Sequence, residues 1–168
     1  KRPGFDEYFG GMQDNGTWRS PTGTNASNTT NYVFSIGGDG FEVIWHPLDD
    51  SKLLGGSQGN NFRKSNDGGN TWTSATNGLS GTHPFVSKLA SSKDNPDVVF
   101  TLSSDGVYRS NDFGTNWTLT PIDEKWGSTS FMDIEVSQAN ANIIWAGSAM
   151  VNSGDSRSLH VSTNGGQT

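Results

Sequence analysis

The chain has 168 residues, of which 76 are Gly, Ser, Asn or Thr and only 25 are Ala, Leu, Glu or Lys. Because the first group favours turns and the second favours helix, this composition excludes a helical bundle and predicts an all-β fold. Seventeen acidic residues against eleven basic ones give a net charge of −6, with no cluster of basic residues to hold nucleic acid or an anionic membrane.

Other features of the composition narrow the class of protein further. Hydrophobic residues make up 30% of the chain, and six Trp and nine Phe supply bulk for thin sheet-on-sheet layers. No window is apolar enough to insert into a membrane. The absence of Cys excludes a disulfide framework, a thiolate metal site and a Cys nucleophile.

An internal repeat of 45 residues runs through the chain. Apolar pairs occur at Tyr8-Phe9, Leu53-Leu54, Val98-Val99 and Ile143-Ile144, each 45 residues after the previous one. A period in the forties is typical of propeller blades or solenoid units. The repeats fall at approximately 1–35, which is eroded, and at 36–80, 81–124 and 125–168, of which the last is truncated.

The third repeat predicts the strands of one unit. Short β-prone runs at 85–89, 97–103, 106–110 and 117–120 are separated by turn-forming residues. Such a unit matches a four-stranded antiparallel blade of a β-propeller. Because 168 residues hold about 3.7 repeats, we expect a partial arc of about four blades that continues beyond both ends, with the remaining blades of the same propeller as its partners.

A second marker follows the same register. Ser65–Trp72 and Ser110–Trp117 share the pattern S-x-D-x-G-x-x-W, and a third copy begins at Ser162 with Asn in the Asp position. We predict a structural role, in which Asp accepts backbone N–H groups, Gly takes a positive φ and Trp packs beneath the loop. The positions concerned are Ser65, Asp67, Gly69 and Trp72, then Ser110, Asp112, Gly114 and Trp117, then Ser162, Asn164 and Gly166.

These boxes resemble the Asp-box, or BNR, repeats of sialidases, sortilin-type receptors and xyloglucanase-type glycoside hydrolases, all of which are β-propellers. The segments Gly10–Trp18 and Gly37–Phe41 are similar to parts of large secreted bacterial proteins with sortilin-like or BNR-like propellers. The resemblance implies a propeller in an extracellular setting, secreted or at the cell surface. It does not select an activity.

Ligands of propellers usually bind at the face that carries the loops between blades and the loops between the second and third strands of each blade, and this directs attention to two segments. Trp126 has no counterpart in the repeat register, so either it stacks on a sugar ring or it packs between blades. The last repeat carries a seven-residue insertion that contains Asn152, Asp155 and Arg157, which is either a specificity loop or a harmless length variant.

Glycoside hydrolysis needs two carboxylates across a cleft, about 5–10 Å apart. Asp14 and Asp39 fall on the ligand-binding face and are candidates, although a turn-forming Asp beside Gly explains both without catalysis. Sialidase activity is disfavoured because Arg19, Arg63 and Arg109 each lie beside a box and the Arg-Ile-Pro motif of that family is absent.

We expect no cofactor and no metal site. The three His residues are isolated from one another in the sequence, and no Gly-rich stretch precedes a helix as a phosphate loop would. Calcium stays open, because Asp-Asn-Gly turns can supply oxygen ligands.

Three hypotheses on function follow. The first is a non-catalytic extracellular propeller module that acts as a scaffold or as a recognition surface for a glycan or protein ligand. The second is a fragment of a xyloglucanase-type glycoside hydrolase that cleaves β-glucan or a related polysaccharide. The third is a structural repeat of a surface assembly.

Overall fold

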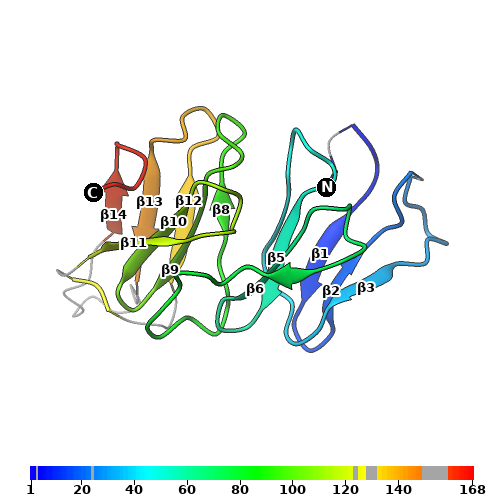
Figure 1. Ribbon diagram of the computed structural model, residues 1–168, viewed down its shortest axis with the longest axis horizontal. Coiled ribbons are helices and arrows are strands. Elements are labelled where there is room, and N and C mark those ends of the chain that lie inside the picture. Colours follow the sequence, from blue (N-terminus) through cyan, green and yellow to red (C-terminus); the bar gives the residue numbers. More distant parts are fainter. Residues whose placement is uncertain (3, 24, 123–124, 128–131, 149–158) are drawn as a thin grey trace.

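The computed structural model describes residues 1–2, 4–23, 25–122, 125–127, 132–148 and 159–168. In these segments fourteen strands form four antiparallel sheets (Figure 1), which confirms the all-β prediction. No helix in the described part of the chain is long and apolar enough to cross a membrane.

Each sheet is a meander in which chain neighbours pair. The first sheet contains β1 (Phe9–Met12), β2 (Gly16–Arg19) and β3 (Val33–Ile36). The second contains β4 (Val43–Trp45), β5 (Leu53–Ser57), β6 (Asn61–Ser65) and β7 (Thr73–Ser74). The third contains β8 (Ala90–Ser91), β9 (Val99–Ser103), β10 (Gly106–Ser110) and β11 (Thr118–Pro121). The fourth contains β12 (Asp133–Val136), β13 (Ile144–Gly147) and β14 (Leu159–Ser162).

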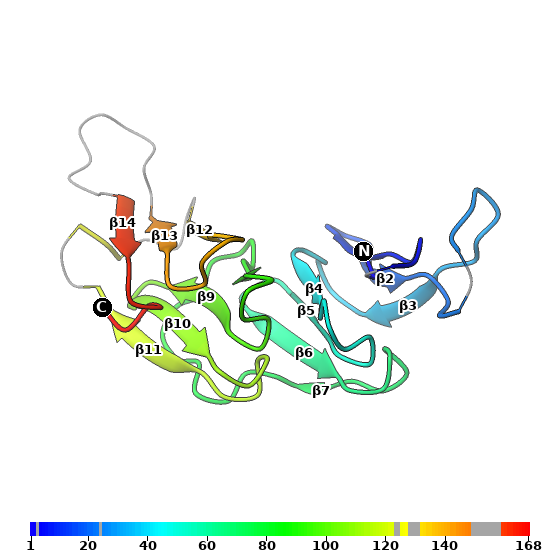
Figure 2. The same ribbon diagram turned by 90° about the horizontal axis from the view of Figure 1, so that it is seen from above.

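The four sheets follow one another in an arc, from β1–β3 at one end to β12–β14 at the other (Figure 2). Three apolar clusters fill the spaces between consecutive sheets. The repeated apolar pairs explain this layering, because neighbouring residues of a strand point to opposite faces. Leu53 packs towards the first sheet and Leu54 towards the third. A strand covered on both sides therefore needs two consecutive apolar residues.

The predicted strand boundaries were wrong at the start of the third sheet. The strand expected at 85–89 is only Ala90–Ser91. The preceding residues bond to a turn of the second sheet instead, since the Gly59 N–H donates to the Pro84 and Phe85 carbonyls. Phe85 and Val86 consequently stay 54% and 43% exposed.

The strand expected at 117–120 is also displaced, by one residue, to Thr118–Pro121. The backbone N–H of Trp117 donates to the carbonyl of Asn77 in the second sheet's trailing loop, at 2.9 Å. Trp117 therefore belongs to the junction between two sheets. The strand expected at 97–103 begins at Val99, whereas the one at 106–110 has the predicted bounds.

Candidate functional site

One face of the arc, formed by the same ends of all the sheets, gathers the loops that join consecutive sheets and the turns between their middle strands. The segment Gly37–Phe41 passes between the β1–β2 turn and the β5–β6 turn. The Asp14 N–H donates to Asp39 Oδ1 at 2.7 Å, and the Asp39 N–H donates to Gln58 Oε1 at 2.9 Å. The Gly40 N–H donates to the Met12 carbonyl at 3.0 Å. Three stretches distant in sequence are thus bonded into one surface.

Glycines allow this close crossing of backbones. A Cβ on Gly11 would lie 2.2 Å from the Phe41 carbonyl oxygen, and a Cβ on Gly40 would lie 2.2 Å from the Gly16 carbonyl oxygen. Both obstacles are backbone atoms that a side-chain rotation cannot clear. Gly11 and Gly40 are therefore required by the packing of this face of the arc, whereas Gly10 has open space around its Cα.

Asp14 and Asp39, the two residues predicted from the sequence, are in contact here through the Asp14 backbone and the Asp39 carboxylate. Asp14 is exposed and has a φ of 63°, a turn conformation that Asp tolerates. Asp39 is half-buried, and one of its carboxylate oxygens accepts the Asp14 N–H. This bond joins the loop to the β1–β2 turn. It corresponds to the structural role that the sequence analysis gave as the alternative to catalysis.

A row of charges that the sequence reasoning missed lies at the first strands of three consecutive sheets. Lys88 Nζ is 3.0 Å from Glu42 Oε1 and 3.3 Å from Asp133 Oδ1. The Leu89 N–H also donates to Glu42 Oε2, at 2.6 Å. A signal was present, because Lys88 and Asp133 are 45 residues apart and carry opposite charges.

The environment of Lys88 favours its charged form. Burial lowers the pKa of its ammonium group, but the hydrogen bonds and negative charges of Glu42 and Asp133 outweigh burial, and the pKa stands above its ordinary value. Lys88 is thus a cation that links the second, third and fourth sheets.

Two aromatic rings lie beside this charged row. Phe41 and Phe85 meet edge to face, with ring centroids 5.6 Å apart. Phe85 is 54% exposed, so this residue of the pair is open to solvent. A flat exposed ring beside carboxylates and amides suits a sugar, which has an apolar face and hydroxyl edges. The repeat register assigned Phe85 to a strand, so its exposure was not predicted.

A polar groove of about 490 Å³ runs from this surface along the first two sheets. Its lining combines hydroxyl, amide and guanidinium groups with one indole ring. The residues are Ser35, Ile36, Gly37, Gly38, Ser57, Gln58, Asn61, Arg63 and Trp72. Gln58 belongs both to this groove and to the Asp39 hydrogen bonds, so the groove and the surface are continuous.

Trp126 lies in the core between the third and fourth sheets. Its side chain is 8% exposed, its indole N–H donates to the Ser103 carbonyl at 2.9 Å, and its ring meets His160 edge to face. Of the two alternatives left open by the sequence, this position corresponds to packing between blades. The other ligand candidates, Asn152, Asp155 and Arg157, lie outside the described residues.

The boxes lie at the other ends of the sheets and share one hydrogen-bond pattern. In the first, Ser65 Oγ donates to Asp67 Oδ1 and accepts the Gly69 N–H, while Asp67 Oδ1 accepts the Thr71 N–H. The second and third boxes repeat these bonds at Ser110–Asn116 and Ser162–Thr168. Asn164 supplies its amide oxygen where the others supply a carboxylate, so the pattern folds a turn without requiring a charge.

Hydrogen bonds nevertheless hold the carboxylates of the first two boxes ionised. The hydroxyl and N–H of Thr71, followed by Ser65, lower the pKa of Asp67 to about 2.

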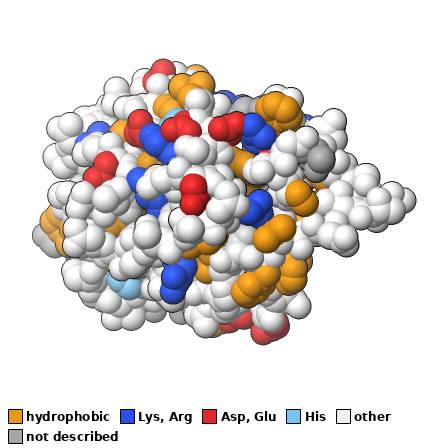
Figure 3. All heavy atoms as spheres, turned by 45° about the vertical axis from the view of Figure 1, so that its right-hand side comes forward, with side chains coloured by type: hydrophobic (Ala, Val, Ile, Leu, Met, Phe, Trp, Pro, Cys, Tyr) orange, Lys and Arg blue, Asp and Glu red, His pale blue; other side chains and the backbone are white. Residues whose placement is uncertain are grey.

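Among the described residues, no group of three His, Asp or Glu side chains lies close enough to hold a metal ion. On the side of the molecule in Figure 3, acidic and basic side chains are interspersed.

Comparison with known proteins yields similarity of fold. No protein-family model and no curated protein matches the chain. Among solved structures, an ancestral GH74 enzyme matches 99% of this chain with a TM-score of 0.70 and 15% identity. A GH74 enzyme of Niastella koreensis matches 95% with a TM-score of 0.55 and 22% identity. The chain spans 22% of the length of each, so it resembles part of a GH74 propeller.

Proposed function

We propose that this chain is part of a larger propeller of the xyloglucanase-type glycoside hydrolase class, in a secreted or cell-surface protein. We propose further that the face of the arc with Asp39, Glu42 and Phe85 holds a β-glucan chain. The supporting observation is the similarity of fold to a GH74 enzyme over 99% of the chain. It favours the hydrolase hypothesis over a scaffold of unrelated function.

The chemistry of the surface supports a glycan ligand. Phe85 offers an open ring for the apolar face of a sugar. The amide of Gln58 and the carboxylates of Asp39 and Glu42 offer hydrogen-bond partners for the hydroxyl edge. The groove that begins at Gln58 gives an extended ligand room to continue along the second sheet.

Binding is tested with cello-oligosaccharides and xyloglucan oligosaccharides by isothermal titration calorimetry. Phe85→Ala removes the stacking surface, and we expect affinity to fall about three- to tenfold. Leu48→Ala is the matched control, because Leu48 is also an exposed apolar residue and lies in a turn away from this surface. Equal affinity of the Phe85→Ala and Leu48→Ala variants would remove Phe85 from the proposed contact.

Hydrolysis is tested in the larger protein that contains this chain. If Asp14 and Asp39 act as the carboxylate pair, Asp14→Asn or Asp39→Asn lowers the rate of β-glucan cleavage by about 100-fold or more, while oligosaccharide binding persists. Unchanged cleavage in both variants would exclude these two residues from catalysis.

A non-catalytic recognition module is the second candidate. The observation in its favour is that Asp39 and Glu42 already serve structural bonds, to the Asp14 N–H and to Lys88 and the Leu89 N–H. This candidate predicts oligosaccharide binding by the surface and no hydrolysis by the protein that contains it.

A further inference from the structure

The polar groove between the first and second sheets is lined by one charged side chain, Arg63 of β6. Arg63 stands 45 residues before Tyr108, which is fully buried against the second sheet and bonds to the Ser80 carbonyl at 2.8 Å. Ser35 stands 45 residues before Ser80 and lines the groove with Arg63. Arg63 is exposed, and among the described residues its guanidinium has no hydrogen-bond or ion-pair partner. The position that Tyr108 fills in the next sheet is therefore an unpaired cation here.

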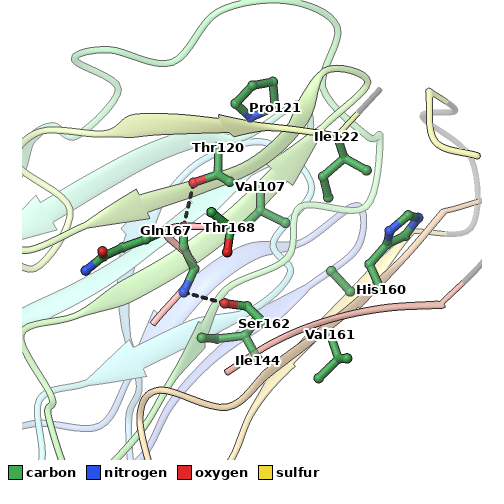
Figure 4. Close-up of a pocket in the computed structure, with 12 residues that line it drawn as sticks. Val107, Thr120, Pro121, Ile122, Ile144, His160, Val161, Ser162, Gln167 and Thr168 are labelled. Carbon is green, nitrogen blue, oxygen red and sulfur yellow. Dashed lines mark hydrogen bonds between the residues drawn. The ribbon is translucent and has the colours of Figure 1, made fainter. Parts of the chain in front are cut away.

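The corresponding position of the fourth sheet, counting the seven-residue insertion, is His160. His160 lines an apolar hollow together with Val107, Ile122 and Ile144 (Figure 4). No Lys, Arg, Asp or Glu is found in the described lining of that hollow. Of the three junctions between sheets, the first thus places a permanent positive charge where the others place a neutral or titrating ring.

Further hydrogen-bond donors line the groove beside Arg63. Ser57 pairs with Asn61, two positions along β6 from Arg63, so these three side chains share one face of the second sheet. Ser57 is 5% exposed, and its hydroxyl has no partner in the part of the chain that the structure describes. The Gln58 amide oxygen accepts the Asp39 N–H at 2.9 Å, which leaves the Gln58 amide N–H groups available as donors.

The charge of this lining selects the class of ligand. The described lining contains no Asp or Glu, although the chain as a whole carries a net charge of −6. A neutral ligand leaves the guanidinium without a counter-charge, whereas a carboxylate supplies one. The planar guanidinium presents two parallel N–H donors, and this fork matches the two oxygens of a carboxylate.

We propose that this groove is a subsite for a carboxylate-bearing sugar, a uronic acid residue of the bound glycan, and that Arg63 selects it. The inference rests on the proposed glycan surface, because Gln58 belongs to both that surface and the groove. Arg63 holds the carboxylate, while the Ser57 hydroxyl and the Gln58 amide donate to oxygens of the sugar ring and its hydroxyls. An acidic glucan gains this anchor, and a neutral glucan lacks it.

The first experiment compares ligands that differ by one carboxylate, using isothermal titration calorimetry. They are cellotetraose and two forms of it in which one terminal glucose, at either end, is oxidised at C6 to glucuronate. We expect one of the two acidic forms to bind the chain about tenfold more tightly than cellotetraose. In the Arg63→Gln variant this ratio of affinities should fall to about one. Equal affinities of all three ligands for the wild-type chain, or a ratio that survives Arg63→Gln, would overturn the proposal.

Two further variants separate the guanidinium fork from net charge. Arg63→Lys keeps the charge and loses the fork, so its ratio should lie between those of wild type and Arg63→Gln. Lys93→Gln removes one positive charge from an exposed bend between β8 and β9 and should keep the wild-type ratio. Equal loss of the ratio in Lys93→Gln and Arg63→Gln would show an effect of net charge and would contradict a site at Arg63.

The second experiment distinguishes failure of this subsite from failure of the glycan surface. Methyl β-glucuronide and methyl β-glucoside are titrated while the Arg63 Nε–H resonance is followed by 15N NMR. We expect a saturable shift with the glucuronide and none with the glucoside. A glucuronide shift without any binding of cellotetraose would support the subsite and refute the glycan surface. No glucuronide shift, or an equal shift with inorganic sulfate, would overturn the assignment of the groove to a sugar carboxylate.

Discussion

The junction between the second and third sheets differs from the junction between the third and fourth in what fills it. In the former, Tyr108 and Trp117 occupy the space, and Tyr108 is fully buried. In the latter, His160 stands at the position of Tyr108, counting the seven-residue insertion, and its ring meets the buried indole of Trp126 edge to face. Both junctions keep the same box and the same strand order. The repeat therefore specifies the backbone frame, and different large side chains fill the two junctions.

The largest effect is expected from emptying the filled junction. Trp117→Ala should lower the free energy of unfolding by about 3–5 kcal/mol, because it leaves a cavity and removes the hydrogen bond to Ala75. Urea denaturation followed by circular dichroism measures this change. Trp145→Ala is the control, since Trp145 is 46% exposed and should cost much less. Similar losses in the two variants would contradict the comparison between the junctions.

A smaller effect is expected from removing one hydroxyl in the same junction. Tyr108 Oη donates to the Ser80 carbonyl at 2.8 Å and accepts the Ser80 N–H at 3.1 Å. Tyr108→Phe should lower the free energy of unfolding by about 1 kcal/mol. Tyr32→Phe, at an exposed position, should have almost no effect on the same urea midpoint. A Tyr108→Phe midpoint equal to wild type would show that this bond contributes nothing.

The boxes also differ in charge, because the first two carry an Asp carboxylate and the third carries Asn164 at the same position. The lowered pKa of Asp67, about 2 against an ordinary 3.8, means that its ionised form stabilises the folded state above about pH 4 and that this stabilisation is lost as the pH falls through about 2. Burial opposes ionisation of Asp112, yet the Asn116 donors and the Ser110 hydroxyl hold its pKa below the ordinary value, so its contribution has the same sign.

The third box, with Asn164, should lack this titration. We expect the amide resonances of Thr71 and Asn116 to titrate with midpoints below 3.8 in 15N NMR spectra. The Gln167 amide, whose N–H donates to Asn164 Oδ1, should gain a comparable titration only in the Asn164→Asp variant. Identical Gln167 curves in the two chains would refute the assigned hydrogen bond.

The smallest effect concerns the charged row that crosses both junctions. Lys88→Met removes the ion pairs to Glu42 and Asp133, which are partly exposed, and should cost less than about 1 kcal/mol. The loss should shrink further in 1 M NaCl, because salt screens such pairs. Lys93→Met, at an exposed position, serves as the control. A loss above 2 kcal/mol that salt does not change would indicate a packing role for Lys88 instead.

Sequence reasoning predicted the parts of the fold that repeat. The apolar pairs and the boxes identified sheets stacked face to face, because both patterns report local geometry that every blade needs. It failed at 85–89, a run with strand-like composition. At the start of this run the Phe85 carbonyl accepts the Gly59 N–H of the β5–β6 turn instead of pairing with a strand. Propensity alone cannot reveal that competition.

The candidate site was predicted only in part, for a similar reason. The loops that contain Asp14 and Asp39 predicted that both residues lie on one surface, and the Asp14 N–H donates to Asp39 Oδ1. Phe85 and Glu42 were not found, because their exposure and pairing depend on how two blades meet. Trp126 has no counterpart in the repeat register, which made it a candidate ligand contact. In the structure its indole is buried between two sheets, where its N–H donates to the Ser103 carbonyl.

The proposed glycan surface is tested most directly by mapping a ligand onto the chain. In a 15N NMR titration with a cello-oligosaccharide, we expect shifts that concentrate at residues 37–42 and 85–88, with little change at the boxes 65–72 and 110–117. Shifts confined to the boxes, or no shifts at millimolar oligosaccharide, would contradict it.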